Sequence, residues 1–176
     1  HFRIWGLLGY LIFMATTLLQ THSVIAALDD DQDDIDLLRL LLRKAGIPNP
    51  LEVYQEGEQV VSVLSKLLEN SLKAIQPLLC FLDVKMPGMN GHEVLKWIRG
   101  QRSLDRVPVV MLSSSDHPGD ITKAVEQGAQ CYLAKYPQPA VLSEVVQEAE
   151  RFVLGTPASE CFRLPENLLL VRCRRP

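Results

Sequence analysis

The sequence predicts an α/β protein in which five parallel strands form one doubly wound sheet, with a helix after each strand. Five short apolar segments alternate with five segments whose apolar residues recur every three or four positions. Gly and Pro separate many of these segments. Polar residues directly follow the first, third, fourth and fifth apolar segments. Alternating strands and helices of this kind form a parallel sheet with helices on both faces.

The expected strands are short and almost wholly apolar, as in a sheet that helices cover on both sides. They span residues 24–28, 51–54, 78–82, 107–112 and 131–134. Pro108 lies at the start of the fourth strand, where it is tolerated because the first residues of a strand need not donate to the ladder.

The expected helices have apolar residues on one side. They run from Ile35 to Ala45, over 58–72, around 94–98, over 121–127 and over 141–153. Gly46, Gly100 and Gly128 mark the ends of the first, third and fourth helices, since glycine readily ends a helix.

Composition excludes several classes of protein. The 176 residues are 47% hydrophobic and 22% charged, which is typical of a folded globular domain. The net charge of −3 argues against a nucleic-acid-binding surface over the whole chain. The four cysteines form no CxxC pair, so a zinc ribbon or a thioredoxin-type site has no support. Scattered thiols are typical of a reduced, cytoplasmic protein, and we expect Cys80 and Cys131 to lie in the core.

Both ends of the chain lie outside the alternating pattern. Residues 1–22 form an N-terminal extension whose apolar part is short for a membrane span, which needs about 20 apolar residues. A signal peptide, a membrane anchor and a natural start at Met14 after 13 foreign residues are all open, and we favour the last. Residues 155–176 are interpreted as a solvated tail, with a basic docking arm as the alternative. The domain then spans residues 23–154.

Polar residues that follow the strands are expected to meet at one edge of the sheet, where parallel sheets carry their chemistry. They are Asp29 and Asp30, Asp83, Ser113 with Ser114, and Lys135. Carboxylates about 4 Å apart repel one another by about 4 kcal/mol at an effective dielectric constant of 20, unless a cation joins them. Mg²⁺ prefers such oxygen ligands. A carboxylate beside Mg²⁺ can attack a phosphoryl group, whose charge the lysine and serine then offset.

Four segments in this order resemble the receiver domains of two-component response regulators. They are Leu28-Asp29-Asp30-Asp31-Gln32-Asp33-Asp34, Phe81-Leu82-Asp83-Val84-Lys85-Met86-Pro87-Gly88-Met89-Asn90-Gly91, Pro108-Val109-Val110-Met111-Leu112-Ser113-Ser114-Ser115, and Gly128-Ala129-Gln130-Cys131-Tyr132-Leu133-Ala134-Lys135. The resemblance covers residues 23–154 and implies the flavodoxin-like receiver fold.

The resemblance implies a role for each matching residue. Asp83 corresponds to the phosphorylated aspartate, Asp30 to the direct Mg²⁺ ligand and Asp29 to an acid that reaches the metal through water. The backbone carbonyl of Lys85 corresponds to a further metal ligand. The remaining matches are Ser113 as the switch hydroxyl, Tyr132 as the switch aromatic residue and Lys135 as the phosphoryl-binding lysine.

The resemblance also implies partners. A sensor histidine kinase would supply the phosphoryl group, and the sequence also resembles the stand-alone receivers that partner phytochrome-type kinases. Without an output domain, the phosphorylated protein would act on a downstream protein target or form a weak homodimer. We expect no nucleic acid and no membrane as partners.

One residue departs from the family pattern. Receivers usually have a proline directly after the lysine, with a cis bond between them, whereas here Tyr136 intervenes and Pro137 follows. A cis bond before a residue other than proline costs about 2.5–4 kcal/mol. The loop either carries that strain or takes a different path.

Two other functions remain as alternatives. A pseudo-receiver would bind partners without phosphorylation, yet the acidic residues and Lys135 are all present. A phosphatase of the haloacid dehalogenase type would have an aspartate two positions after the nucleophile, where this chain has Lys85, so we expect no enzyme.

Several polar residues are expected to have no special role. Asp33 and Asp34 are acids at a helix N-terminus, where they interact favourably with the helix dipole. His92 and His117 are interpreted as lone exposed histidines, and Trp97 as a residue that packs on or caps a surface.

Overall fold

The computed structural model describes residues 23–69, 77–114 and 117–154. Its strands are β1 (Ile25–Leu28), β2 (Leu51–Tyr54), β3 (Leu79–Asp83), β4 (Val109–Ser113) and β5 (Cys131–Ala134). Its helices are α2 (Gln32–Lys44), α3 (Gly57–Glu69), α4 (Gly91–Arg99), the short 3₁₀ helix η1 (Arg102–Leu104), α5 (Pro118–Glu126) and α6 (Pro139–Leu154). The predicted alternation of strands and helices is confirmed.

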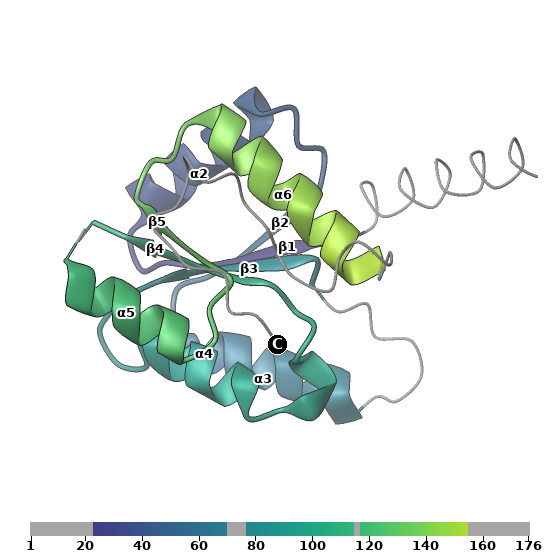
Figure 1. Ribbon diagram of the computed structural model, residues 1–176, viewed down its shortest axis with the longest axis vertical. Helices are drawn as coiled ribbons and strands as arrows, with labels where there is room; N and C mark the ends of the chain where they lie inside the picture. Colours follow the sequence, from purple (N-terminus) through teal and green to yellow (C-terminus); the bar gives the residue numbers. More distant parts are fainter. Residues whose placement is uncertain (1–22, 70–76, 115–116, 155–176) are drawn as a thin grey trace, which may run out of the picture.

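The five strands form one parallel sheet in the order β2-β1-β3-β4-β5. Figure 1 shows α2 and α6 on one face of this sheet and α3, α4 and α5 on the other. The order reverses beside β1, so β1 and β3 flank the switch point where ligands bind in doubly wound sheets. The predicted doubly wound fold is therefore confirmed.

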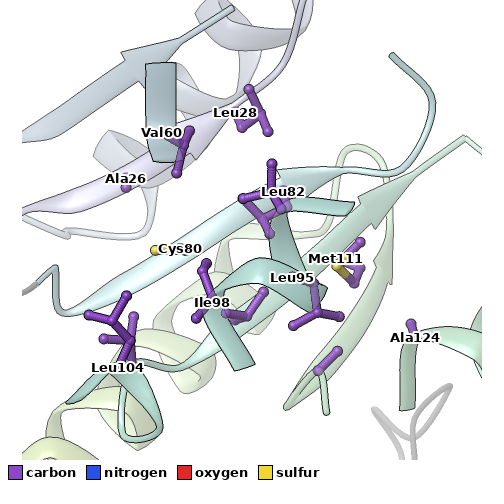
Figure 2. Close-up of a cluster of buried hydrophobic side chains, with 14 of the residues drawn as sticks. Ala26, Leu28, Val60, Cys80, Leu82, Leu95, Ile98, Leu104, Met111 and Ala124 are labelled. Carbon is purple, nitrogen blue, oxygen red and sulfur yellow. The ribbon is translucent and has the colours of Figure 1, made fainter. Parts of the chain in front are cut away.

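Each face of the sheet carries its own apolar core. Ala26, Cys80 and Met111 face α3, α4 and α5, in the cluster drawn in Figure 2. Ile25 and Phe81 face α2 and α6. Successive strand residues alternate between the two faces, which explains why the strands are apolar at nearly every position. Cys131 lies with Ile25 in the second core, so both cysteines predicted to be internal are buried.

Some element boundaries differ from the sequence predictions for local reasons. Strand β4 begins at Val109 because the backbone N–H of Val107 instead donates to the carbonyl of Leu104, closing a turn after η1. Helix α5 begins at Pro118, three residues before the predicted start, because proline suits the first position of a helix. The side chain of His117 caps this helix by accepting from the backbone N–H of Gly119.

The predictions for the chain ends concern residues 1–22 and 155–176, which lie outside the described residues, as do positions 70–72 of the predicted second helix. Within the described part of the chain, no helix combines the length and the apolar character that crossing a membrane requires.

Candidate functional site at the carboxyl edge of the sheet

The predicted site residues meet at the carboxyl ends of four strands. Asp29 follows β1, Asp83 is the last residue of β3 and Ser113 is the last residue of β4. Lys135 follows β5, and its backbone N–H donates to the carbonyl of Ser113 over 2.7 Å. The parallel register thus brings together residues that are up to 106 positions apart in the sequence, counted from Asp29 to Lys135.

Three carboxylates form a potential cation site. One oxygen each of Asp29, Asp30 and Asp83 lies within 4.8 Å of the others. Asp29 and Asp83 are buried, whereas Asp30 is exposed to solvent. Because carboxylate oxygens on an open edge are the ligands that Mg²⁺ prefers, and Mg²⁺ keeps several waters, the three groups fit a hard divalent cation.

Backbone groups orient the two buried carboxylates. The Oδ1 atom of Asp29 accepts from the N–H of Asp31 at 3.0 Å. The Oδ1 atom of Asp83 accepts from the N–H of Lys85 at 3.2 Å. The side chain of Lys85 is exposed, and the metal-ligand role of its carbonyl stays a prediction.

Helix α4 starts directly against the backbone of Asp83. A Cβ atom at Gly91 would lie 2.1 Å from the Asp83 carbonyl oxygen, so only glycine permits this approach. The preceding Asn90 caps the helix by accepting from the N–H groups of His92 and Glu93, and the Glu93 side chain completes the capping box. The Asn-Gly pair of the motif therefore fixes the position of α4 relative to Asp83.

Lys135 bridges the carboxylates. Its Nζ atom lies 3.1 Å from Asp83 Oδ2, 3.0 Å from Asp29 Oδ2 and 2.5 Å from Asp34 Oδ2. Only 12% of the lysine side chain is exposed, so solvent screens these contacts less than at an open surface. One ammonium group therefore faces three carboxylates, which leaves the cluster with excess negative charge.

The pKa values reflect this crowding. Burial raises the pKa of both Asp29 and Asp83, and hydrogen bonds from backbone N–H groups and from Lys135 only partly offset it. Burial alone would lower the pKa of Lys135, but its hydrogen bonds to Asp34, Asp29 and Asp83 outweigh burial and raise that pKa. Desolvation therefore disfavours two charged carboxylates that a bound cation would stabilise.

Asp34 is the site residue that sequence reasoning missed. We expected it to act only on the helix dipole, but it binds Lys135 from the first turn of α2. Asp31 is the actual N-cap, since its side chain accepts from the N–H of Asp33 at 2.8 Å. The available signal was helical phase: Asp34 precedes buried Leu38 by four positions, so both lie on the same side of α2.

The loop after Lys135 takes a different path from the family pattern. The described residues contain no cis peptide bond, and Tyr136 instead adopts a left-handed conformation with φ of 67°. Such a conformation costs a residue other than glycine about 1–3 kcal/mol and persists only where the surroundings impose it. Here the Tyr136 hydroxyl donates to Asp34 Oδ1 over 2.5 Å. The sequence left open a strained cis bond or a different path for this loop, and the structure shows the different path.

The two predicted switch residues lie on the neighbouring strands β4 and β5. Ser113 is fully buried at the end of β4. Tyr132 lies on β5 with 1% of its surface exposed, inside the core that faces α3, α4 and α5. Tyr132 is therefore part of the apolar packing rather than the charged cluster, and its role as a switch stays a prediction.

His92 corrects a prediction. It is buried in α4 rather than exposed, and its Nδ1 atom lies 2.6 Å from Gln127 Oε1. Its Nε2 atom has no hydrogen-bond partner among the described residues. Residue 92 faces inward because it lies one turn from buried Leu95. His117 is exposed, as expected, and Trp97 packs against the core.

Comparisons with known proteins agree with this geometry. Residues 25–147 match the family described as the response regulator receiver domain. The chain is 32% identical over 136 residues to the response regulator Rcp1 of Synechocystis sp., an alignment that covers 76% of this chain and 90% of Rcp1.

Solved structures show the same similarity. The Mn²⁺-bound form of Rcp1 is 31% identical, with a TM-score of 0.57, over 81% of this chain and 99% of that one. The phosphorylated cyanobacterial phytochrome response regulator RcpA is 28% identical, with a TM-score of 0.58, over 76% and 95% of the two chains. Since the matched residues 25–147 include the acidic pair, Asp83, Ser113 and Lys135, this chain belongs to the family of response regulator receiver domains of two-component systems.

Proposed function

We propose that this protein is a single-domain response regulator that accepts a phosphoryl group from a sensor histidine kinase onto Asp83, in a Mg²⁺-dependent reaction. The observation that carries the proposal is the position of Asp83. Its buried carboxylate forms a potential cation site with Asp29 and Asp30, and it also lies 3.1 Å from the Lys135 ammonium group. A nucleophile needs this combination to accept a highly charged group.

The divalent cation would be held by Asp29, Asp30 and Asp83, with the carbonyl of Lys85 as a further ligand. When bound, Mg²⁺ supplies positive charge that offsets both the carboxylates and the incoming phosphoryl oxygens. The raised pKa values of Asp29 and Asp83 support this assignment, because burial disfavours both charged carboxylates and a nearby positive charge would stabilise them. The Mn²⁺-bound structure of Rcp1 concerns that relative, and we extend divalent-cation binding to this chain by homology.

The residues of the chain have distinct parts in the transfer. A carboxylate oxygen of Asp83 attacks the phosphorus atom of a phosphohistidine. The new oxygen–phosphorus bond forms as the nitrogen–phosphorus bond breaks, and the histidine leaves with its electron pair. Lys135, whose Nζ lies 3.1 Å from Asp83 Oδ2, offsets the charge on the transferred oxygens. The Ser113 hydroxyl binds one of those oxygens.

The output is a change in a protein-binding surface. When Ser113 binds the phosphoryl oxygens, Tyr132 repacks, and the change reaches the face formed by α5, β5 and α6. A phosphoryl group shifts this equilibrium only by its different affinity for the two states. We expect a downstream protein or a second copy of the chain to bind this face, and we expect the protein to function in the cytoplasm with a phytochrome-type kinase as its partner, by analogy with RcpA.

The phosphatase alternative has no support from the site. The position two residues after Asp83 holds Lys85 instead of the aspartate that such an enzyme uses as its acid–base group. The pseudo-receiver alternative would be favoured only by failure of the phosphorylation test.

Acetyl phosphate or the cognate kinase tests phosphorylation directly. Intact-mass spectrometry should show the gain of one phosphoryl group in the wild type with Mg²⁺, and no gain in EDTA or in Asp83→Asn. Asp33→Asn, which removes an exposed acid of α2, is the matched control and should be modified like the wild type. An equal mass gain in Asp83→Asn would place the acceptor elsewhere.

The metal and the switch need separate measurements. Asp30→Asn should weaken Mg²⁺ binding severely in calorimetry. Ser113→Ala should keep part of the phosphorylation but lose most of the change in self-association, measured by sedimentation velocity with and without beryllofluoride. If the wild type keeps one sedimentation coefficient and the NMR signals around Tyr132 do not move, the switch proposal is wrong.

A further inference from the structure

Two residues to which the resemblance gives no role, Asp34 and Tyr136, lie beside the phosphoryl-binding lysine, and Asp34 contacts it directly. Asp34 accepts from Lys135 through Oδ2 and from the Tyr136 hydroxyl through Oδ1, each over 2.5 Å. The three residues come from two elements, since Asp34 is on α2 and the other two follow β5. We call Asp34 and Tyr136 together the Asp34–Tyr136 clamp.

The backbone conformation at Tyr136 is specific to the clamp. Tyr136 is, among the described residues other than glycine, the one with a positive φ. The backbone N–H of Lys135 is fixed to Ser113, so the left-handed turn at Tyr136 directs its hydroxyl back toward α2. More than half of the tyrosine remains exposed, so burial of its ring does not explain the strained conformation. The hydrogen bond to Asp34 is the specific contact that this conformation provides.

Lys135 has no hydrogen-bonding capacity to spare. An ammonium group has three N–H donors, and three carboxylates lie within 3.1 Å of its Nζ atom. An incoming phosphoryl oxygen must therefore replace one carboxylate. Asp83 becomes part of the acyl phosphate, and Asp29 lies in the cation cluster. Asp34 is the remaining competitor, and it belongs to no cation cluster among the described residues.

We propose that the Asp34–Tyr136 clamp positions Lys135 and partly neutralises it, so that the site binds the divalent cation more tightly and the phosphoryl group more weakly than it would without the clamp. Asp34 is a positioning residue, since it acts through Lys135. This inference rests on the proposed function of Asp83 and Lys135.

The two effects have opposite signs for an electrostatic reason. The negative charge of Asp34 attracts a cation bound nearby, and it holds the repelling ammonium group to one side. The same negative charge repels a phosphoryl group and shares the lysine that should bind it. A role limited to folding would move both affinities in one direction or neither.

The test measures the two affinities separately. Calorimetry gives the Mg²⁺ affinity of the metal-free protein, and ¹H–¹⁵N NMR gives the beryllofluoride affinity at saturating Mg²⁺. Asp34→Asn should weaken Mg²⁺ binding about fivefold and strengthen beryllofluoride binding about threefold, as loss of one nearby partly screened charge implies. Asp33→Asn removes the same charge from the adjacent exposed position of α2 and should change neither affinity appreciably.

Tyr136→Phe is the second variant, because it removes only the hydroxyl of an exposed residue and should leave the fold intact. It should shift both affinities in the same directions as Asp34→Asn, by less than half as much on a logarithmic scale. The clamp is ruled out if Asp34→Asn matches Asp33→Asn, or if it weakens binding of both ligands. If the wild type binds no beryllofluoride and acetyl phosphate does not modify Asp83, the proposed function fails as well.

Discussion

Two regions of this molecule each contain a partly buried basic side chain, and the surroundings of the two side chains differ in charge. At the carboxyl edge of the sheet, Lys135 is surrounded by carboxylates. At the far end of α4, Arg99 is surrounded by neutral oxygens. They are the carbonyls of Gly128, Leu104 and Val107 at 3.0, 3.4 and 3.1 Å, and Gln130 Oε1 at 2.7 Å.

The difference separates a functional cluster from a structural one. Burial lowers the pKa of Arg99, whereas carboxylate contacts raise that of Lys135. The Arg99 acceptors carry no charge, so the region is complete without a ligand and joins α4, η1 and the start of β5. The Lys135 cluster carries more negative than positive charge, and its carboxylates fit a divalent cation. The residues of the first region fit one another, whereas those of the second fit a ligand.

Removing Arg99 should have the largest effect on stability. Arg99→Met leaves the carbonyls of Gly128 and Val107 without a donor, and each unsatisfied buried group costs about 1–3 kcal/mol. The Leu104 carbonyl and Gln130 Oε1 keep the backbone N–H groups of Val107 and Val109. We expect urea denaturation to show a loss of about 3 kcal/mol, unchanged by Mg²⁺. Arg39→Met, which removes an exposed pair with Asp36, is the control and should cost less than about 1 kcal/mol. Equal losses in the two variants would contradict this account.

Removing Lys135 should have a smaller effect that Mg²⁺ reverses. Lys135→Met leaves Asp29, Asp34 and Asp83 without their shared ammonium group, and we expect a loss of about 2 kcal/mol in EDTA. Saturating Mg²⁺ should recover most of that loss, because a ligand that binds only the folded state stabilises it. A loss that persists in Mg²⁺, as expected for Arg99→Met, would erase the difference between the regions.

Neutralising Asp83 should stabilise the metal-free protein. Burial raises the pKa of this carboxyl group, so its charged form is a cost to the fold. We expect Asp83→Asn to increase the free energy of unfolding by about 1 kcal/mol in EDTA at pH 7. Asp33→Asn should leave stability nearly unchanged. A destabilised Asp83→Asn protein would mean that Lys135 already compensates the cluster fully.

The last predicted effect concerns His92, which lies on the same helix as Arg99 and also has a neutral partner. Burial lowers its pKa below the ordinary 6.5. As the pH falls through 6.5, the unfolded state takes up a proton before the folded state does, so stability present above that pH is lost below it. One proton limits the change to about 1.4 kcal/mol per pH unit.

Urea denaturation of wild type and His92→Leu between pH 7.5 and 5.5 measures this term. The wild type should lose stability relative to the variant as the pH falls. A difference that stays constant over this range would show that His92 keeps its ordinary pKa in the folded protein.

The sequence by itself determined the fold and the core of the site. Apolar runs of strand length alternate with helical periodicity, and the carboxyl ends of parallel strands must meet at one edge. Asp29, Asp30, Asp83, Ser113 and Lys135 could therefore be brought together from their positions after strands alone. Their order also carried the resemblance to receiver domains, which the match over residues 25–147 confirmed.

Only the tertiary structure decided which polar residues serve the site and which serve the core. Asp34 and exposed Asp33 are adjacent acids of one helix turn, and only the packing of α2 against the β5–α6 loop directs Asp34 to Lys135. The loop at Tyr136 could contain a cis bond or take a different path. In the structure it makes a left-handed turn, in which the Tyr136 hydroxyl donates to Asp34. His92 is buried because its position on α4 faces the core, where its ring contacts Gln127. Such choices depend on contacts between residues 35 to 102 positions apart, which local sequence patterns do not encode.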